Sequence, residues 1–190
     1  YAFNPNIKPS NRGAIALKGN SKKLKLKAEL PFYALSFPVP SLSTIDNEKT
    51  AYTLEMLAYV LDNGLSKSLI RNQQIASSIG VGYRLYDKYD TLFTLSFIPA
   101  SGVSNDTVLK AIKTQVAELI NNPNFIQGEL SRTKAQLESD FVFEQDQIST
   151  QSYYLGMLST VGLGVDKMFT YVDKMNEIKA EDVSKAAKQY

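Results

Sequence analysis

Four acidic side chains lie within nine residues of this sequence, at residues 138–146. Glu138, Asp140, Glu144 and Asp146 could bind a metal ion, or act as a general acid and base, if their carboxylates converged on one point. Their spacing distributes them around a predicted helix instead, which favours a solvated helix surface. We therefore assign neither a metal ligand nor a catalytic residue to this group.

The 190-residue sequence contains no histidine and no cysteine. It therefore lacks a Ser-His-Asp triad, a histidine base, the usual zinc ligands and a cysteine nucleophile. The formal net charge of +2, from 21 basic and 19 acidic residues, argues against nucleic acid as a partner. The sequence predicts no catalytic residue, no metal and no cofactor in this chain.

A polar group precedes the most unusual strand pattern in the chain. Arg71 is followed by Gln73 and Gln74, and this group could bind a peptide backbone. Residues 75–86 then alternate large and small side chains, which predicts a strand with one nearly bare face that a ligand can approach closely. The Gly-Val-Gly run lies inside this strand rather than between a strand and a helix, so we interpret it as strand packing or a bend and not as a phosphate loop.

Five aromatic residues lie in this strand and beyond it: Tyr83, Tyr86, Tyr89, Phe93 and Phe97. They could form a surface that binds a peptide or a nucleotide. Pairing of aromatic rings across a hairpin explains the same pattern, and we favour that interpretation.

The first strand is predicted from an alternating pattern and is limited by prolines. Residues 22–27 alternate lysine and leucine, which favours a solvated edge strand over a membrane or nucleic-acid patch. We expect this strand to continue to residue 37. Pairing should start at Pro31 and stop at Pro38, because proline lacks the N–H that a ladder needs. Residues 1–21 are expected to be an irregular lead-in.

The remaining elements are mostly helices. The first is predicted to have Asp46 as its N-cap and Asn63 with Gly64 as its left-handed C-terminal stop. A short helical piece should follow at residues 66–72, and the turn at residues 87–90 predicts an antiparallel hairpin. Further helices are predicted over residues 105–121, 127–145, 152–163, 167–177 and 182–190.

This order of elements predicts the α+β class, with an antiparallel sheet in one layer and helices packed on one face of it in the other. Residues 22–190 are expected to form a single domain, and a hydrophobic fraction of 44% is enough for a sizeable core. The longest uncharged run, residues 147–165, is too short in its apolar part for a membrane span. We therefore predict no membrane span.

The order of several segments resembles one family. AELPFYALSFPVPSL is followed by a helix ending in LDNG, then by SLIRNQQIASSIGVGY and DTLFTLSFIPASGVS. Later come ELSRTKAQLESDFVFEQD, YYLGMLSTVG and IKAEDVSKAAKQY. Over residues 24–190 this arrangement is similar to the non-catalytic, C-terminal type of domain in bacterial zinc metallopeptidases of the pitrilysin/insulinase type.

The resemblance implies the two-layer α+β fold of pitrilysin and mitochondrial processing peptidase-like domains, which enclose an unfolded peptide in a chamber. In this family an inverted His-x-x-Glu-His helix on the N-terminal type of domain binds zinc. Zinc is therefore expected on the preceding domain of the parent protein. The expected partners are that catalytic domain, or a partner subunit, and an unfolded peptide substrate. Relatives are often exported, so the expected location is the periplasm, with the cytoplasm as the alternative.

Many relatives use an arginine and a tyrosine, seven residues apart, to position the substrate near zinc. The family pattern places Ile70 and Ser77 at these positions, so the pair is predicted to be absent. Arg71 lies one position away, and Tyr83 lies on the same predicted strand. We therefore expect substrate contacts at Arg71, Ser77 and Tyr83.

The sequence thus predicts the non-catalytic domain of a zinc-dependent metalloendopeptidase, which forms part of a peptide-enclosing chamber and contacts the substrate. The alternative is an inactive peptidase-like scaffold subunit that assembles with an active, zinc-bearing partner. A free-standing α+β binding module is a third hypothesis.

Overall fold

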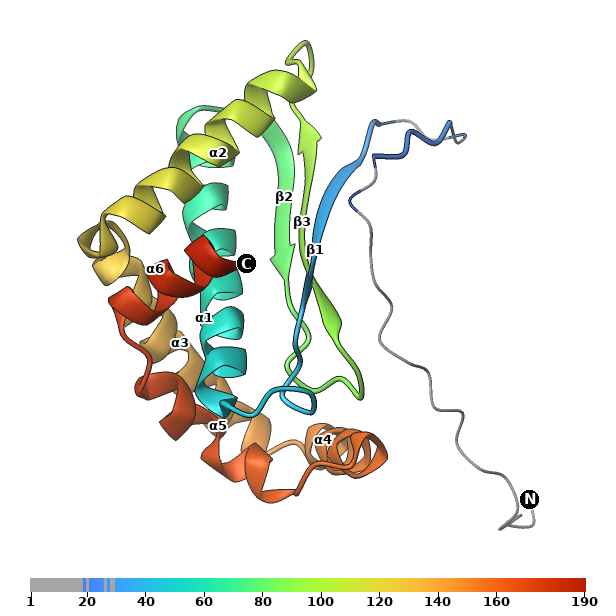
Figure 1. Cartoon of the computed structure of the whole chain (residues 1–190), viewed down its shortest axis with the longest axis vertical. Helices are drawn as coiled ribbons and strands as arrows, with labels where there is room; N and C mark the ends of the chain where they lie inside the picture. The colour runs from blue at the N-terminus through green and yellow to red at the C-terminus, as the bar shows by residue number, and fades with distance from the viewer. Residues whose placement is uncertain (1–18, 20, 26, 28–29) are drawn as a thin grey trace.

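The computed structural model describes residues 19, 21–25, 27 and 30–190 (Figure 1). Its elements are β1 (Tyr33–Val39), α1 (Glu48–Leu65), the π-helix η1 (Ser66–Asn72), β2 (Ala76–Gly82), β3 (Thr91–Pro99), α2 (Asn105–Asn121), the 3₁₀ helix η2 (Pro123–Ile126), α3 (Gln127–Gln145), α4 (Ile148–Val161), α5 (Asp166–Asn176) and α6 (Ala180–Gln189). The predicted lead-in at residues 1–21 lies almost entirely outside the described residues.

The three strands form one antiparallel sheet with the order β1-β3-β2. Tyr33 of β1 and Ile79 of β2 both lie opposite Phe97 of β3, so the side chains of these three residues share one face. Helices α1, α2 and α6 lie on one side of the sheet (Figure 1). The predicted α+β class, with a sheet layer and a helix layer, is confirmed.

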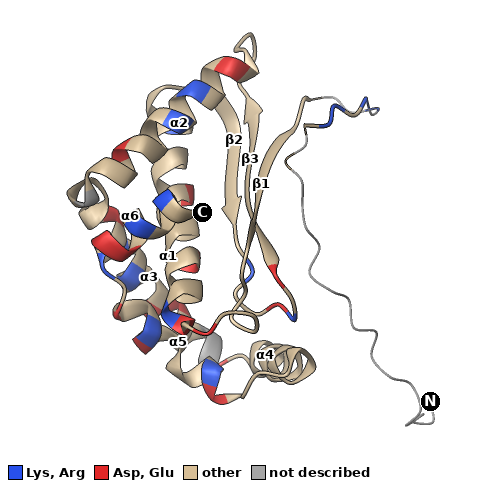
Figure 2. Ribbon diagram, viewed as in Figure 1, with Lys and Arg blue, Asp and Glu red and all other residues tan. Residues whose placement is uncertain are grey.

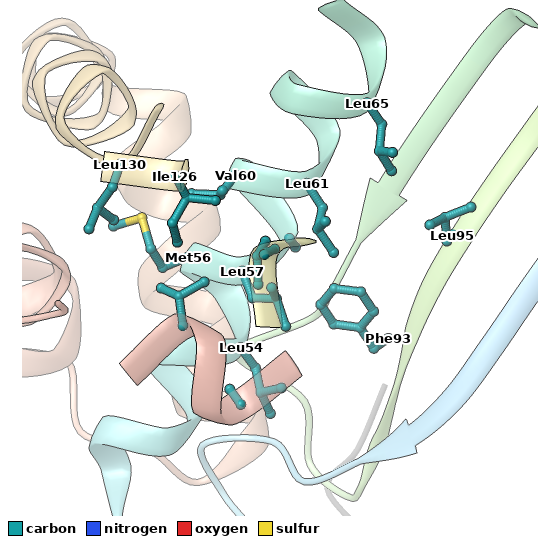
Figure 3. Packing of buried hydrophobic residues seen from close by; sticks show 14 of the residues in the cluster. Leu54, Met56, Leu57, Val60, Leu61, Leu65, Phe93, Leu95, Ile126 and Leu130 are labelled. Carbon is teal, nitrogen blue, oxygen red and sulfur yellow. The ribbon is translucent and has the colours of Figure 1, made fainter. Parts of the chain in front are cut away.

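Helix α1 lies at the centre of the core because it is buried on most of its surface. Its buried residues are Ala51, Tyr52, Thr53, Leu54, Met56, Leu57, Ala58, Val60, Leu61 and Leu65. Figure 3 shows Phe93 of β3 next to Leu57 on the sheet side of this helix. On its other side, Val60 lies next to Ile126. The helix thus contacts the sheet and the outer helices at once.

Both predicted ends of α1 are wrong. Its N-cap is Asn47, whose side chain accepts a hydrogen bond from the Lys49 N–H, and not Asp46. The chain does not stop at Gly64 either, because helical structure continues into η1. Leu65 and Leu69 are fully buried, and their burial continues the apolar side of the helix past the local Asn-Gly signal.

The first strand is shorter than predicted at its N-terminal end. Residues 22–25 and residue 27 are in no strand, and β1 begins at Tyr33. β1 pairs only with β3, which ends at Pro99, so no partner strand extends far enough to pair with residues 22–27. At the other end β1 continues through Pro38 to Val39, because an edge strand tolerates a proline whose missing N–H faces away from the sheet.

The second strand ends at Gly82, four residues earlier than predicted, and residues 83–90 form a loop. This loop is held against the segment after β1. The Leu42 N–H donates to the backbone oxygen of Leu85 at 3.0 Å, and the Ser41 hydroxyl donates to that of Asp87 at 3.0 Å. These two hydrogen bonds hold the 83–90 loop against residues 41 and 42.

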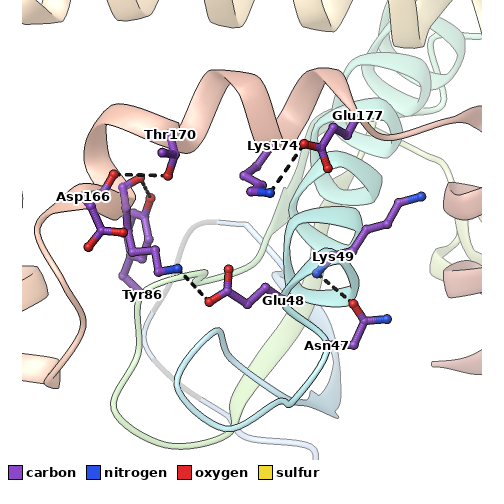
Figure 4. A network of polar contacts seen from close by, with 9 residues as sticks. Asn47, Glu48, Lys49, Tyr86, Asp166, Thr170, Lys174 and Glu177 are labelled. Atoms are coloured by element: carbon purple, nitrogen blue, oxygen red, sulfur yellow. Dashed lines mark hydrogen bonds and ion pairs between the residues drawn. The ribbon is translucent and has the colours of Figure 1, made fainter.

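The start of α5 is tied to the same region by polar contacts (Figure 4). Lys167 forms an ion pair of 2.7 Å with Glu48 in the first turn of α1. The Tyr86 hydroxyl, from the loop after β2, donates to the backbone oxygen of Lys167 at 3.4 Å.

None of the described helices combines the length and apolar character that a membrane crossing requires.

Candidate functional site

The sheet face turned away from α1 is uncharged and built largely of small side chains. It consists of Ala34 and Ser36 of β1, Ser78, Gly80 and Gly82 of β2, and Thr94 and Ser96 of β3, with Pro38, Leu92 and Ile98 toward its ends. Figure 2 shows no acidic or basic residue on the three strands. We refer to this surface as the open sheet face. The predicted nearly bare face of residues 75–86 is confirmed for Ser78, Gly80 and Gly82 only. Ala76 is buried, and Arg84 and Tyr86 lie in the loop after β2.

The small residues of this face allow close packing between the strands. A Cβ atom at Gly80 would lie 3.3 Å from the Ser96 hydroxyl oxygen, and that hydroxyl donates to the Gly80 backbone oxygen. The hydroxyls of Ser36 and Thr94 are 3.3 Å apart. Nothing lies within 4 Å of the equivalent position at Gly82. The face is therefore polar through hydroxyls and free of charge.

Ser77 lies at an irregularity in the β2–β3 pairing. The register shifts between Ala76 and Ser78, so the residue between them is the extra residue of a bulge. The Ser77 hydroxyl donates to the backbone oxygens of Ile98, at 3.2 Å, and Pro99, at 3.4 Å. Its hydroxyl therefore stabilises the bulge, while the residue itself is exposed.

Arg71 lies in η1, immediately before β2. The π-helical segment is anchored by Ser68, whose hydroxyl accepts hydrogen bonds from Gln73, at 3.0 Å, and from Gln115. Arg71 is exposed, and its guanidinium makes no hydrogen bond or ion pair within the described part of the chain. Gln74, which follows, has a φ of 53°, a conformation uncommon for a residue other than glycine. This end of β2 thus presents an unpaired cation beside an irregular backbone.

Tyr83 lies at the opposite end of β2 and packs against the core. Its hydroxyl donates to the Pro40 backbone oxygen at 2.8 Å, and burial raises the pKa of this phenol well above its usual range. At roughly 3.3 Å per residue, Ser77 and Tyr83 are about 20 Å apart along an extended chain. The structure thus brings Arg71 and Ser77 together at one end of β2 and leaves Tyr83 at the other.

A cavity of about 590 Å³ lies at the end of the sheet where Tyr83 is found, between α1, the 83–90 loop, α3, α4 and α5. We call it the tyrosine cavity. Its aromatic lining includes Tyr59, Tyr86, Tyr153, Tyr154 and Tyr171. Its ionisable lining includes Glu55, Arg84, Asp87 and Asp140.

Glu55 contributes a largely enclosed carboxyl group to this cavity. The residue keeps some exposure, but its Oε2 atom is buried and has no hydrogen-bond partner. Burial raises the pKa of the Glu55 carboxyl to about 8, and a hydrogen bond with Tyr171 opposes that rise. A carboxyl group in this state binds a proton at neutral pH.

Sequence reasoning did not identify the tyrosine cavity. One signal was present, because Glu55 is the only charged residue between Thr50 and Leu61, in a run that is otherwise apolar or uncharged. Asp140 was interpreted as a solvated helix residue. Asp140, Glu138 and Asp146 are all exposed, which confirms a solvated surface for these three residues. Asp140 also lines the tyrosine cavity.

The aromatic residues are paired in a way that the hairpin interpretation did not predict. Phe97 stacks on Tyr33 of β1, with ring centroids 5.1 Å apart and an interplanar angle of 12°. The partner strand is thus β1, not the other strand of the hairpin. Tyr86 instead lines the tyrosine cavity.

Nothing in this chain matches a zinc site. The sequence has no histidine or cysteine. Across residues 30–190 and the few described positions before them, no three acidic side chains are grouped closely enough to hold a metal ion. The residues that the structure describes therefore do not fit zinc.

Comparison with known proteins points to one family. A family model described as the peptidase M16 inactive domain matches residues 2–137. No curated protein sequence matches the chain.

Several solved structures share the fold. The inactive peptidase domain of a predicted zinc protease from Bordetella parapertussis has a TM-score of 0.69 and 18% identity, and the match covers 86% of each chain. A predicted zinc protease from Bordetella pertussis Tohama I has a TM-score of 0.66 and 19% identity, with 82% of this chain and 84% of that chain covered. A protease from Helicobacter pylori has a TM-score of 0.76 and 17% identity over 87% of this chain, which spans only 40% of that protease.

Proposed function

Since the chain belongs to the peptidase M16 inactive-domain family, we propose that it is the non-catalytic domain of a zinc-dependent metalloendopeptidase and forms part of the wall of a peptide-enclosing chamber. The catalytic domain, in the same protein or in a partner subunit, would bind the zinc and lower the pKa of its bound water to about 7. This chain would hold the peptide. We also propose a periplasmic location, with which the absence of cysteine is compatible.

The observation that carries the proposal is the open sheet face. Helices α1, α2 and α6 cover the other face of the sheet, and the open sheet face is uncharged and carries several hydroxyls. An unfolded peptide presents backbone amides and side chains of many types. Because the open sheet face has no charge and mostly small side chains, it can bind peptides of many sequences. Edge strand β2 and the free guanidinium of Arg71 add groups that can bind a peptide backbone.

A photo-crosslinking residue tests which layer faces the substrate. In the assembled protease, inactivated by removal of zinc, we expect a crosslinker in place of Ser78 on the open sheet face to label a bound peptide. The matched control replaces Lys110, an exposed residue of α2 in the helix layer, and should give background labelling. Equal labelling from both positions, or labelling from Lys110 alone, would contradict the chamber-wall proposal.

Arg71 is expected to contribute to substrate binding and not to the chemical step. Arg71→Ala should raise KM for peptides by about three- to tenfold with kcat unchanged, because it removes a contact that ground state and transition state share. Steady-state kinetics of the assembled protease measure this. Lys67→Ala is the control, since Lys67 is an exposed cation of the same η1 segment and pairs with Glu129. A fall in kcat, or equal effects from both variants, would contradict this role.

The scaffold alternative differs only in where the zinc resides. Zinc analysis of the purified protein, with identification of the polypeptide that carries it, decides between them. Zinc on a separate, co-purifying polypeptide would favour a scaffold subunit.

A further inference from the structure

The tyrosine cavity carries a combination of groups that a chamber wall does not need. Aromatic rings from five parts of the fold line it, namely α1, the 83–90 loop, α3, α4 and α5, and carboxyl groups lie among them. We propose that this cavity binds an organic ammonium group, which is either the end of a lysine side chain or a small free cation such as choline.

The aromatic lining suits a cation. Tyr59 comes from α1, Tyr86 from the 83–90 loop, Tyr153 from α4 and Tyr171 from α5, so the rings reach the cavity from different directions. Cations are attracted to the faces of aromatic rings, and several rings around one space are the usual arrangement for binding a quaternary ammonium group. Met157 and Met168 complete the lining with polarizable side chains.

The carboxyl groups supply the charge that such a ligand needs. The Oε2 atom of Glu55 is buried and has no hydrogen-bond partner. No lysine or arginine of the described chain forms an ion pair with Glu55, Asp87 or Asp140. Once Glu55 is ionised, its buried carboxylate is costly without a cation, and a cationic ligand removes that cost. Arg84, the one basic residue of the lining, is exposed.

The size of the cavity sets the scale of the ligand. About 590 Å³ lies within the usual range for small-molecule sites. It exceeds what one ammonium group fills, so the remainder of a ligand can occupy it as well. This volume can hold a lysine side chain with part of its peptide, and it can also hold a small free cation.

The binding should depend on pH through Glu55. Burial raises the pKa of its carboxyl to about 8, and a bound cation favours the ionised form. Burial also raises the pKa values of Tyr86 and Tyr171 well above their usual range, so these two phenols stay neutral in the same pH interval. The charged and titratable groups around Glu55, from every element packed against it, are Tyr52, Tyr59, Tyr83, Arg84, Tyr86, Asp87, Asp140, Tyr153, Tyr154 and Tyr171.

Calorimetric titration of the full-length protein with choline tests the proposal, with 3,3-dimethyl-1-butanol as the uncharged analogue of the same shape. We expect choline to bind about tenfold more tightly at pH 9 than at pH 7, because the ionised fraction of a group with a pKa near 8 rises from about one tenth to nine tenths. Choline itself does not titrate in this range, so the dependence reports on the protein. The alcohol should not bind measurably.

A second pair of ligands distinguishes the source of the ammonium group. Acetyl-lysinamide binding without choline binding would assign the site to a lysine side chain, with acetyl-norleucinamide as the uncharged control. Choline binding without acetyl-lysinamide binding would assign it to a free cation. Either result supports the proposal.

Glu55→Gln tests whether the cavity is the site. This variant should lose about tenfold in affinity at pH 9 and show no pH dependence, while Glu181→Gln, which changes an exposed acid on α6, should bind as the wild type does. Thermal unfolding confirms that both variants are folded. No binding of either cation, equal binding of cation and uncharged analogue, or unchanged binding by Glu55→Gln would overturn the proposal.

Discussion

Replacing Phe97 with alanine is expected to lower the free energy of unfolding by about 3–5 kcal/mol. Phe97 is 1% exposed, lies on the central strand β3 and stacks on Tyr33. Alanine removes the ring and leaves a cavity that the sheet and α1 cannot easily close, since β3 is paired on both sides. Urea denaturation of residues 1–190, followed by circular dichroism, measures the change.

Phe169→Ala is the matched control for this prediction. Phe169 lies on α5 and is 62% exposed, so its removal should change the free energy of unfolding by no more than about 0.5 kcal/mol. If the Phe97 variant kept the midpoint of the wild type, or if the two variants lost equal stability, the described packing of the sheet on the helices would be wrong.

The fold class could be predicted because the period of the apolar residues changes clearly from strand to helix. Two of the failures occurred where the rest of the fold did not support a local pattern. Asn63 and Gly64 indicated a helix end, but Leu65 and Leu69 continue the buried side and the helix continues with them. Residues 22–27 alternate as a strand does, yet no neighbouring strand reaches them. An alternating pattern predicts which face of a strand would be buried. It does not predict whether a neighbouring strand is available to pair with it.

The candidate sites show a similar limit. Arg71, Ser77 and Tyr83 were selected from a resemblance and from one strand, and the structure adds that the hydroxyls of Ser77 and Tyr83 already bind backbone oxygens. Their contact with substrate stays a prediction. The tyrosine cavity could not be assembled from the sequence, because Glu55 and Tyr171 are far apart in the chain and only the fold brings them together. The lone carboxylate in an apolar helix was the one visible signal.

Replacing Glu55 with glutamine is expected to stabilise the fold, and the gain should grow with pH. Burial raises the pKa of the Glu55 carboxyl from 4.5 to about 8, so the folded state keeps a proton that the unfolded state releases. In the wild type, the stability that depends on this proton is complete below pH 4.5 and is lost as the pH rises toward about 8. The loss is about 1.4 kcal/mol per pH unit. Glutamine has the same shape and cannot ionise, so the variant should gain on the order of 5 kcal/mol above pH 8.

Urea denaturation at pH 5, pH 7 and pH 8.5 measures this difference, with Glu181→Gln as the control because Glu181 is exposed. The two glutamine variants should differ little at pH 5 and diverge steadily above it. A constant difference between Glu55→Gln and the wild type across this range would mean that the Glu55 carboxyl titrates as a solvated group. In that case the wild-type cavity would hold no costly unpaired charge at high pH. The pH dependence expected for cation binding would then disappear too, because both effects depend on the same buried oxygen.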